Sequence, residues 1–184
     1  SGLGLVILLS LNLLSILIGI ISFLLLIIYP LSKRVTYWPQ LILGITFNVG
    51  ILIGFSSTTG NINISILFLY VAGIFWTLGY DTIYGFQDIV DDQRIGIKST
   101  SIKFKRNPKT FLLLVYFASI TLWALSLHLL EKPIVVIFLC FSAFIFLLHR
   151  ILKCNLNDPY SCYKTFKYNS YYSLLITIIL IIIK

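Results

Sequence analysis

Six long apolar stretches follow one another along this sequence, separated by short polar connections. A run of about 20 apolar residues crosses the hydrocarbon core of a bilayer, about 30 Å thick, as a helix that satisfies its own backbone polar groups. With 59% hydrophobic residues, 11% charged residues and a mean hydropathy of +1.00, the 184 residues carry more apolar surface than a soluble domain of this size can bury. The sequence therefore predicts an all-α, multi-pass transmembrane helical bundle. The expected spans are residues 11–29, 39–55, 64–80, 110–130, 133–150 and 168–183.

The first apolar segment, residues 3–9, is too short to cross a membrane by itself. A signal peptide is the alternative, but no basic region precedes the segment and no small-residue cleavage site follows it. The sequence also contains no methionine. We therefore expect residues 1–184 to form a single transmembrane domain that is truncated at its N-terminus, within a helix.

The basic residues lie in alternate connections between the expected spans, at 33–34, 94–109 and 150–167, whereas the connections 56–63 and 130–133 carry almost no net charge. Alternate connections share one face. By the positive-inside rule this face is cytoplasmic in a cell inner membrane, or faces the matrix in the mitochondrial inner membrane of a eukaryote. Despite the net charge of +8, no soluble domain or aromatic-basic platform is present, so we expect no nucleic acid partner. The long basic connection is a candidate for contact with anionic lipid head groups.

Four of the six acidic residues lie close together, in the segment DTIYGFQDIVDDQRIGIK at 81–98. Charged groups are avoided in membrane proteins unless they face a protein interior or a wet cavity, so this segment is the candidate functional site. Its polar side chains follow a helical spacing, which predicts that they line one face of a helix. They are Asp81, Tyr84, Asp88 and Asp91 or Asp92.

The carboxylates of this segment predict a metal site. Asp88 and Asp92 are four positions apart, so on a helix they repel each other unless a cation lies between them. Hard carboxylate oxygens without a nearby His or Cys favour Mg²⁺, which often shares its coordination with substrate phosphates. Basic side chains near such a site could hold a diphosphate, although Arg94 and Lys98 could equally be topology signals. The candidates are Tyr29, Lys33, Arg34, Arg94 and Lys98.

Two other groups of polar residues have alternative interpretations. Asn48, inside the second expected span, could form an interhelical hydrogen bond or contact a diphosphate. Cys140, Cys154 and Cys162 have no paired spacing, which indicates neither a zinc site nor a disulfide framework. We expect them to be reduced and to fill space in the packed interior.

Two segments resemble a known family. Residues 80–100, YDTIYGFQDIVDDQRIGIKST, resemble the second aspartate-rich motif of the UbiA superfamily of intramembrane prenyltransferases. Residues 29–50 are similar to the end of the fourth helix of that family and the loop after it, with its Tyr-x-x-x-Lys element at Tyr29 and Lys33. The resemblance is strongest to the branch that prenylates 4-hydroxybenzoate in ubiquinone biosynthesis.

The resemblance implies a bundle of nine helices around a central cavity, in which the six spans correspond to helices four to nine and residues 3–9 to the end of helix three. It also implies an Mg²⁺-dependent transfer of a polyprenyl group from polyprenyl diphosphate to the ring carbon ortho to the hydroxyl of 4-hydroxybenzoate. The first aspartate motif of the family, Asn-Asp-x-x-Asp-x-x-x-Asp, is absent from this sequence. We therefore expect the 184 residues alone to be inactive.

The family resemblance also assigns roles to the residues singled out above. Asp88 and Asp92 are the expected Mg²⁺ ligands, with Asp91 as an alternative ligand. Asp81 is expected to orient the acceptor or a lysine, which makes Asp81, Asp88 and Asp92 the catalytic candidates. The substrate-binding candidates are Tyr29, Lys33, Arg34, Asn48, Tyr84, Arg94 and Lys98.

Three other interpretations stay open from the sequence. A UbiA-type prenyltransferase could act on haem, a naphthoate or a chlorophyll precursor instead of 4-hydroxybenzoate. A transporter would use intramembrane carboxylates as a relay, but it predicts inverted repeats and acids near the middle of the membrane. A non-catalytic remnant is compatible with the missing first motif. The expected partners are the two substrates and the lipid bilayer, and the sequence identifies no protein partner.

Overall fold

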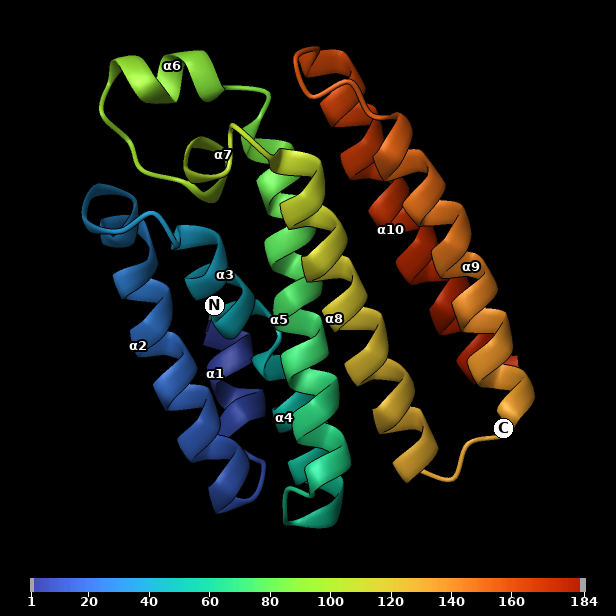
Figure 1. The fold of residues 1–184 in the computed structure, drawn as a ribbon. Coiled ribbons are helices and arrows are strands. Elements are labelled where there is room, and N and C mark those ends of the chain that lie inside the picture. Colours follow the sequence, from blue (N-terminus) through green and yellow to red (C-terminus); the bar gives the residue numbers. More distant parts are fainter. Residues whose placement is uncertain (1, 183–184) are drawn as a thin grey trace.

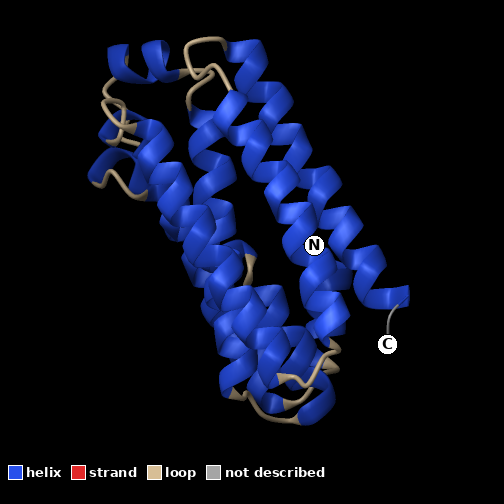
Figure 2. Cartoon of the chain, turned by 45° about the vertical axis from the view of Figure 1, so that its right-hand side comes forward, coloured by secondary structure: helices blue, strands red, loops and turns tan. Residues whose placement is uncertain are grey.

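The computed structural model describes residues 2–182, and all regular secondary structure within that range is helical (Figure 1, Figure 2). Six membrane-length apolar segments occur in it, which confirms the predicted class. The helices are α1 (Gly2–Leu9), α2 (Leu13–Val35), α3 (Pro39–Phe47), α4 (Val49–Thr59), α5 (Ile64–Gly85), α6 (Ile89–Arg94), α7 (Thr100–Lys103), α8 (Pro108–Leu129), α9 (Ile134–Lys153) and α10 (Pro159–Ile182).

Helices α5 and α8 form the centre of the bundle, with α2, α3 and α4 on one side and the antiparallel pair α9 and α10 on the other (Figure 1). The short helices α6 and α7 lie together at one end of the bundle. The connection that contains them joins the end of α5 to the start of α8. The acidic segment therefore lies at a rim of the bundle and not at mid-membrane, unlike the arrangement that a transporter relay predicts.

Helix ends differ from the predicted spans where side chains extend or interrupt a helix. The last span begins at Pro159 and not at residue 168, because the carboxylate of Asp158 accepts the backbone N–H groups of Tyr160 and Ser161 at 3.1 and 3.2 Å. Its predicted end, residue 183, lies outside the described residues. The first span continues to Val35, so the predicted basic residues after it lie on its last turns.

The second span is not one straight helix but is divided into α3 and α4 at Asn48. The side-chain amide of Asn48 donates to the carbonyl of Gly44 at 2.8 Å and to the hydroxyl of Thr77 at 2.9 Å. Of the two interpretations of Asn48, the structure shows the interhelical hydrogen bond.

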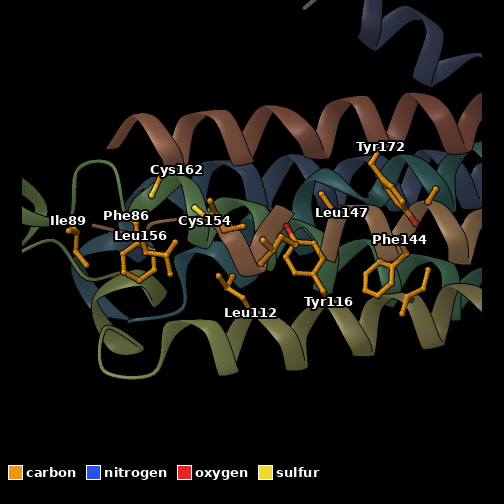
Figure 3. Close-up of a cluster of buried hydrophobic side chains, with 14 residues drawn as sticks. Phe86, Ile89, Leu112, Tyr116, Phe144, Leu147, Cys154, Leu156, Cys162 and Tyr172 are labelled. Atoms are coloured by element: carbon orange, nitrogen blue, oxygen red, sulfur yellow. The ribbon is translucent and has the colours of Figure 1, made fainter. Parts of the chain in front are cut away.

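Polar side chains and close contacts join the central helices. Ser119 and Ser126 on α8 donate to backbone carbonyls of α5 at 2.8 and 2.7 Å, and Tyr116 on α8 donates to Asn169 on α10 at 2.7 Å. Such bonds and small residues replace the hydrophobic driving force that is missing between helices in lipid. Tyr116 is fully buried in the main apolar cluster, with Leu112, Phe144 and Leu147 (Figure 3).

The three cysteines are free and buried, as predicted. Cys154 ends α9 and Cys162 lies on the first turn of α10, and the two side chains lie near each other in Figure 3. The Ser161 hydroxyl lies 3.6 Å from the Cys154 sulfur. A hydrogen bond from Cys162, together with those from Thr165 and Ser161, lowers the pKa of Cys154 to about 6, although burial opposes this shift.

Candidate functional site

The acidic segment is not one continuous helix, so the prediction that its carboxylates share one helix face is wrong. Helix α5 ends at Gly85, and α6 begins only at Ile89. Between them Phe86 is 6% exposed and, with Ile89, packs beside Leu156 in the main apolar cluster (Figure 3). Burial of these two apolar side chains turns the chain back onto the bundle, and this turn separates Asp81 from Asp88.

The loop after α6 is fixed by a buried set of hydrogen bonds, which we call the anchor. Thr82 and Thr100 join their hydroxyl groups at 2.6 Å, and Ser101 donates to the carbonyl of Thr82 at 2.8 Å. The backbone N–H of Thr100 donates to the side chain of Gln40 on α3 at 3.0 Å. A Cβ at Gly85 would lie 2.5 Å from the Ser101 hydroxyl, so glycine leaves room for this contact. The anchor thus connects α3, α5 and α7.

The anchor residues were missed by the sequence analysis. Gln40, Thr82, Thr100 and Ser101 are all buried polar residues. Gln40 at the start of an apolar span and Thr82 beside the acidic residues were the available signals, because a polar side chain in a membrane protein needs a partner.

Lys98 holds the same loop to the end of α2. Its backbone N–H donates to the carbonyl of Lys33 at 2.9 Å, and its ammonium donates to the carbonyl of Val35 at 3.1 Å. The ammonium also lies 5.7 Å from the centre of the Tyr37 ring. These contacts bring the end of α2 against the segment that follows the aspartates, so two predicted site segments meet in space.

Four of the predicted residues gather where these segments meet. The ammonium of Lys33 is within electrostatic reach of Asp81 on α5 and of Asp92 on α6. It also lies 5.7 Å from the centre of the Tyr29 ring, one turn earlier on α2. Three segments that are distant in sequence thus contribute to one site.

Asp92 shows the electrostatic consequence of this arrangement. Burial raises the pKa of its carboxyl above the ordinary value, and the neighbouring charges of Asp88 and Asp91 raise it further, while the Lys33 ammonium opposes the shift. A carboxyl with a raised pKa in a negative environment gains from a nearby cation. Asp88 and Asp92 are also linked through the backbone, since the Asp92 N–H donates to the Asp88 carbonyl at 2.9 Å.

The other predicted residues lie at the edge of the site. Asp91 and Arg94 form an ion pair at 3.3 Å, with about three quarters of each side chain exposed (77% and 75%). Arg34 is exposed on the last turn of α2. Tyr84 points toward α10, where its ring centre lies 5.1 Å from that of Phe166.

We refer to the charged residues of this site together as the acidic rim. Within residues 2–182, no three His, Cys, Asp or Glu side chains are close enough to form a complete metal site. The oxygen donors of Asp88 and Asp92 are nevertheless of the type that Mg²⁺ prefers, and their mutual repulsion fits a cation between them. The members of the acidic rim are Asp81, Asp88, Asp91, Asp92, Lys33, Arg34 and Arg94.

A cavity of about 500 Å³ lies inside the bundle, between α4, α5, α8 and α10. Its lining is mainly apolar and includes Trp76, Trp123 and Tyr172, with Trp76 stacked on Tyr172 at 4.7 Å between ring centres. Tyr80, the residue before Asp81, also lines it, so the cavity reaches toward the acidic rim. Sequence reasoning missed these aromatic residues. The available signal was their place inside the spans, since interface aromatics lie at span ends.

Comparison with known proteins agrees with this arrangement. The sequence profile of the UbiA prenyltransferase family matches residues 1–174. The mitochondrial 4-hydroxybenzoate polyprenyltransferase of Aedes aegypti is 58% identical over 112 residues, which are 60% of this chain and 25% of that protein. The Bos taurus protein of the same name is 43% identical over 177 residues, which are 95% of this chain and 47% of that protein.

A solved structure shares the fold. The apo structure of a UbiA homolog from Aeropyrum pernix K1 superposes with a TM-score of 0.75 at 21% sequence identity, over 94% of this chain and 65% of that one. The chain spans between a quarter and about half of the length of the two curated relatives described above.

Proposed function

This chain belongs to the UbiA prenyltransferase family, and from that membership we propose the reaction of the whole protein. It transfers a polyprenyl group from polyprenyl diphosphate to the ring carbon ortho to the hydroxyl of 4-hydroxybenzoate, a step of ubiquinone biosynthesis. The names of the similar proteins support this acceptor. The observation that carries the proposal is the meeting of Lys33, Asp81 and Asp92, from three separate segments, beside an apolar cavity.

The cations of the rim would bind the diphosphate. Lys33 and Arg34 are exposed on the last turns of α2, and among the described residues neither forms an ion pair. Their positive charge is therefore available for phosphate oxygens, and it would stabilise the charge that develops on the leaving diphosphate. Loss of the diphosphate gives an allylic cation, which the ring carbon of the acceptor attacks.

The carboxylates of the rim would hold a divalent cation. Members of the UbiA family generally depend on such an ion, and we propose Mg²⁺ here because the donors are hard carboxylate oxygens. Asp88 and Asp92 are its proposed ligands and Asp91 an alternative. When bound, the ion supplies positive charge that stabilises the diphosphate.

Asp81 and the cavity would position the organic parts of the substrates. Asp81 is partly buried and acts on Lys33, so we propose that it orients this ammonium or the acceptor. The apolar cavity would take the prenyl chain. Its apolar walls would also keep water from the allylic cation, which water would otherwise quench.

The chain is a multi-pass membrane protein, and we propose the mitochondrial inner membrane as its location. The proteins that it resembles are named as mitochondrial. The acidic rim lies at the end of the bundle that carries the basic connections, so the positive-inside rule favours a rim that faces the matrix. We also propose that residues 1–184 alone do not catalyse transfer, because the first aspartate motif of the family is not among them.

The test is transfer of radiolabelled 4-hydroxybenzoate by the full-length protein, in membranes that lack this activity. We expect wild-type protein to form the prenylated acid, and Asp88→Ala and Asp92→Ala to lose the activity while the protein still inserts. Asp158→Asn is the matched control, because Asp158 caps α10 outside the acidic rim. Activity in both single variants would contradict the site, and transfer only to a naphthoate or a haem would contradict the acceptor.

A further inference from the structure

A second hollow, of about 630 Å³, lies at the same end of the bundle as the acidic rim but contains none of its residues. One wall is the segment 105–110, which leads into α8, and the other is the segment 153–157, which connects α9 to α10. The polar backbone and side chains of these two connections enclose it where the apolar helices end.

The hollow carries a concentrated positive charge. Four cations line it and no acidic residue does. The nearest acidic residue in the sequence, Asp158, accepts two backbone N–H groups at the start of α10. In the part of the chain that the structure describes, none of the four cations forms an ion pair. They are Lys105, Arg106, Lys109 and Lys153.

The hydrogen bonds of these side chains leave most of their donors free. Lys105 donates to the side chain of Gln93 at 3.1 Å and Lys109 to the carbonyl of Leu152 at 2.8 Å, and both acceptors are neutral. Arg106 and Lys153 are exposed. The N-terminus of the 22-residue helix α8 adds to the positive potential, since Asn107 at its N-cap makes no side-chain capping bond. An anion in the hollow would neutralise charge that the protein leaves uncompensated.

The position of the hollow indicates which anion this is. Exposed apolar side chains of α8 and α9 begin directly beside it, among them Leu114 and Leu152. A head group in the hollow can therefore leave its acyl chains against these helices, whereas a soluble anion would gain nothing from them. Basic pockets between membrane helices on the positive face suit the phosphates of anionic lipids. We propose that this hollow binds the phosphate head group of an anionic phospholipid of the surrounding bilayer, independently of the prenyl transfer proposed above.

The test compares two pairs of substitutions in the full-length protein. The protein is purified in a neutral detergent, mixed with phosphatidylglycerol or phosphatidylcholine, and the bound lipid is measured by native mass spectrometry. We expect wild-type protein to retain phosphatidylglycerol preferentially, and Arg106→Gln with Lys153→Gln to weaken this binding roughly tenfold. Lys164→Gln with Lys167→Gln removes the same charge from exposed positions of α10 outside the hollow, and should leave the binding unchanged.

Further arms separate the proposal from its rivals. Arg106→Lys with Lys153→Arg keeps the charges and should restore binding, which distinguishes a lost site from a damaged fold. Equal weakening by both Gln pairs would mean diffuse surface attraction and would overturn the proposal. Binding of inorganic phosphate or diphosphate at the hollow without phospholipid retention would overturn it too. Prenyl transfer is assayed in parallel, so loss of transfer in every preparation, wild type included, would refute the proposed function and leave the lipid result standing.

Discussion

The anchor and the acidic rim occupy the same connection between α5 and α8, yet their polar groups are treated in opposite ways. In the anchor, the side chains of Gln40, Thr82, Thr100 and Ser101 are buried and hydrogen-bonded to one another or to backbone groups. In the acidic rim, the described residues form one ion pair, Asp91 with Arg94, and it is mostly exposed. The difference indicates a division of work. Satisfied groups fix the loop, and unsatisfied charges are left for ligands.

The strongest way to break this comparison is to remove the central cation of the rim. Lys33→Met should lower kcat/KM for prenyl transfer by roughly 10² to 10³, the usual cost of losing one group that stabilises developing charge. The free energy of unfolding should not fall, because the Lys33 side chain is exposed and makes no ion pair within residues 2–182. Steady-state kinetics and thermal unfolding of the full-length protein measure the two effects.

The matched control for this variant is Lys164→Met, which removes the same side chain from an exposed position on α10. It should leave both measurements unchanged. If Lys33→Met destabilised the protein as much as it slowed transfer, Lys33 would belong with the anchor, and the division between the two regions would fail.

The reciprocal change is in the anchor. Thr100→Val leaves the buried hydroxyl of Thr82 with one partner fewer and should cost about 1 to 3 kcal/mol in the free energy of unfolding. The double variant with Thr82→Val should cost less than the sum of the two single changes, because both ends of the bond are then apolar. Unfolding in mixed detergent micelles measures these energies. Thr121→Val, at an exposed site on α8, is the control and should have little effect. Strict additivity would contradict the proposed coupling.

A third variant tests how α3 presents Gln40 to the anchor. A Cβ at Gly44 would lie 2.9 Å from the carbonyl oxygen of Ile74 on α5, and this backbone cannot move aside. Gly44→Ala should therefore destabilise the protein by about 1 to 3 kcal/mol. A Cβ at Gly50 on α4 would meet no heavy atom within 4 Å, so Gly50→Ala should be neutral or slightly stabilising. A similar loss in both variants would mean that helix flexibility, and not the contact with α5, is what glycine provides.

The sequence was sufficient to predict the six spans and the residues of the rim, because hydropathy and charge act locally. It was not sufficient for the turn between α5 and α6. The spacing from Asp81 to Asp92 fits one helix, but burial of Phe86 and Ile89 against Leu156, a residue far along the chain, overrides it. Helical spacing cannot reveal a packing partner that lies in another segment.

The interruption at Asn48 and the anchor have the same cause. Asn48 divides a span because its amide reaches Thr77 on the neighbouring helix, and Thr100 finds Gln40 60 positions away. Each residue was visible as a polar group in an apolar chain, but its partner depended on the packing of helices. Only its need for a partner could be read from the sequence.

The smallest expected effect concerns charge within the rim. The pKa of Asp92 is raised by burial first and then by Asp88 and Asp91, against the Lys33 ammonium. Asp92 must be ionised to hold a cation, so prenyl transfer should fall as the pH drops through this pKa. Asp91→Asn removes one neighbouring negative charge and also frees Arg94 from its ion pair. Both changes favour the ionised form of Asp92, so the acid limb of kcat/KM should move to lower pH. Asp158→Asn should leave the profile in place. A shift to higher pH in Asp91→Asn would show that Asp91 is itself a cation ligand whose loss outweighs the relief of repulsion, and Asp91 would then take the role proposed for Asp92.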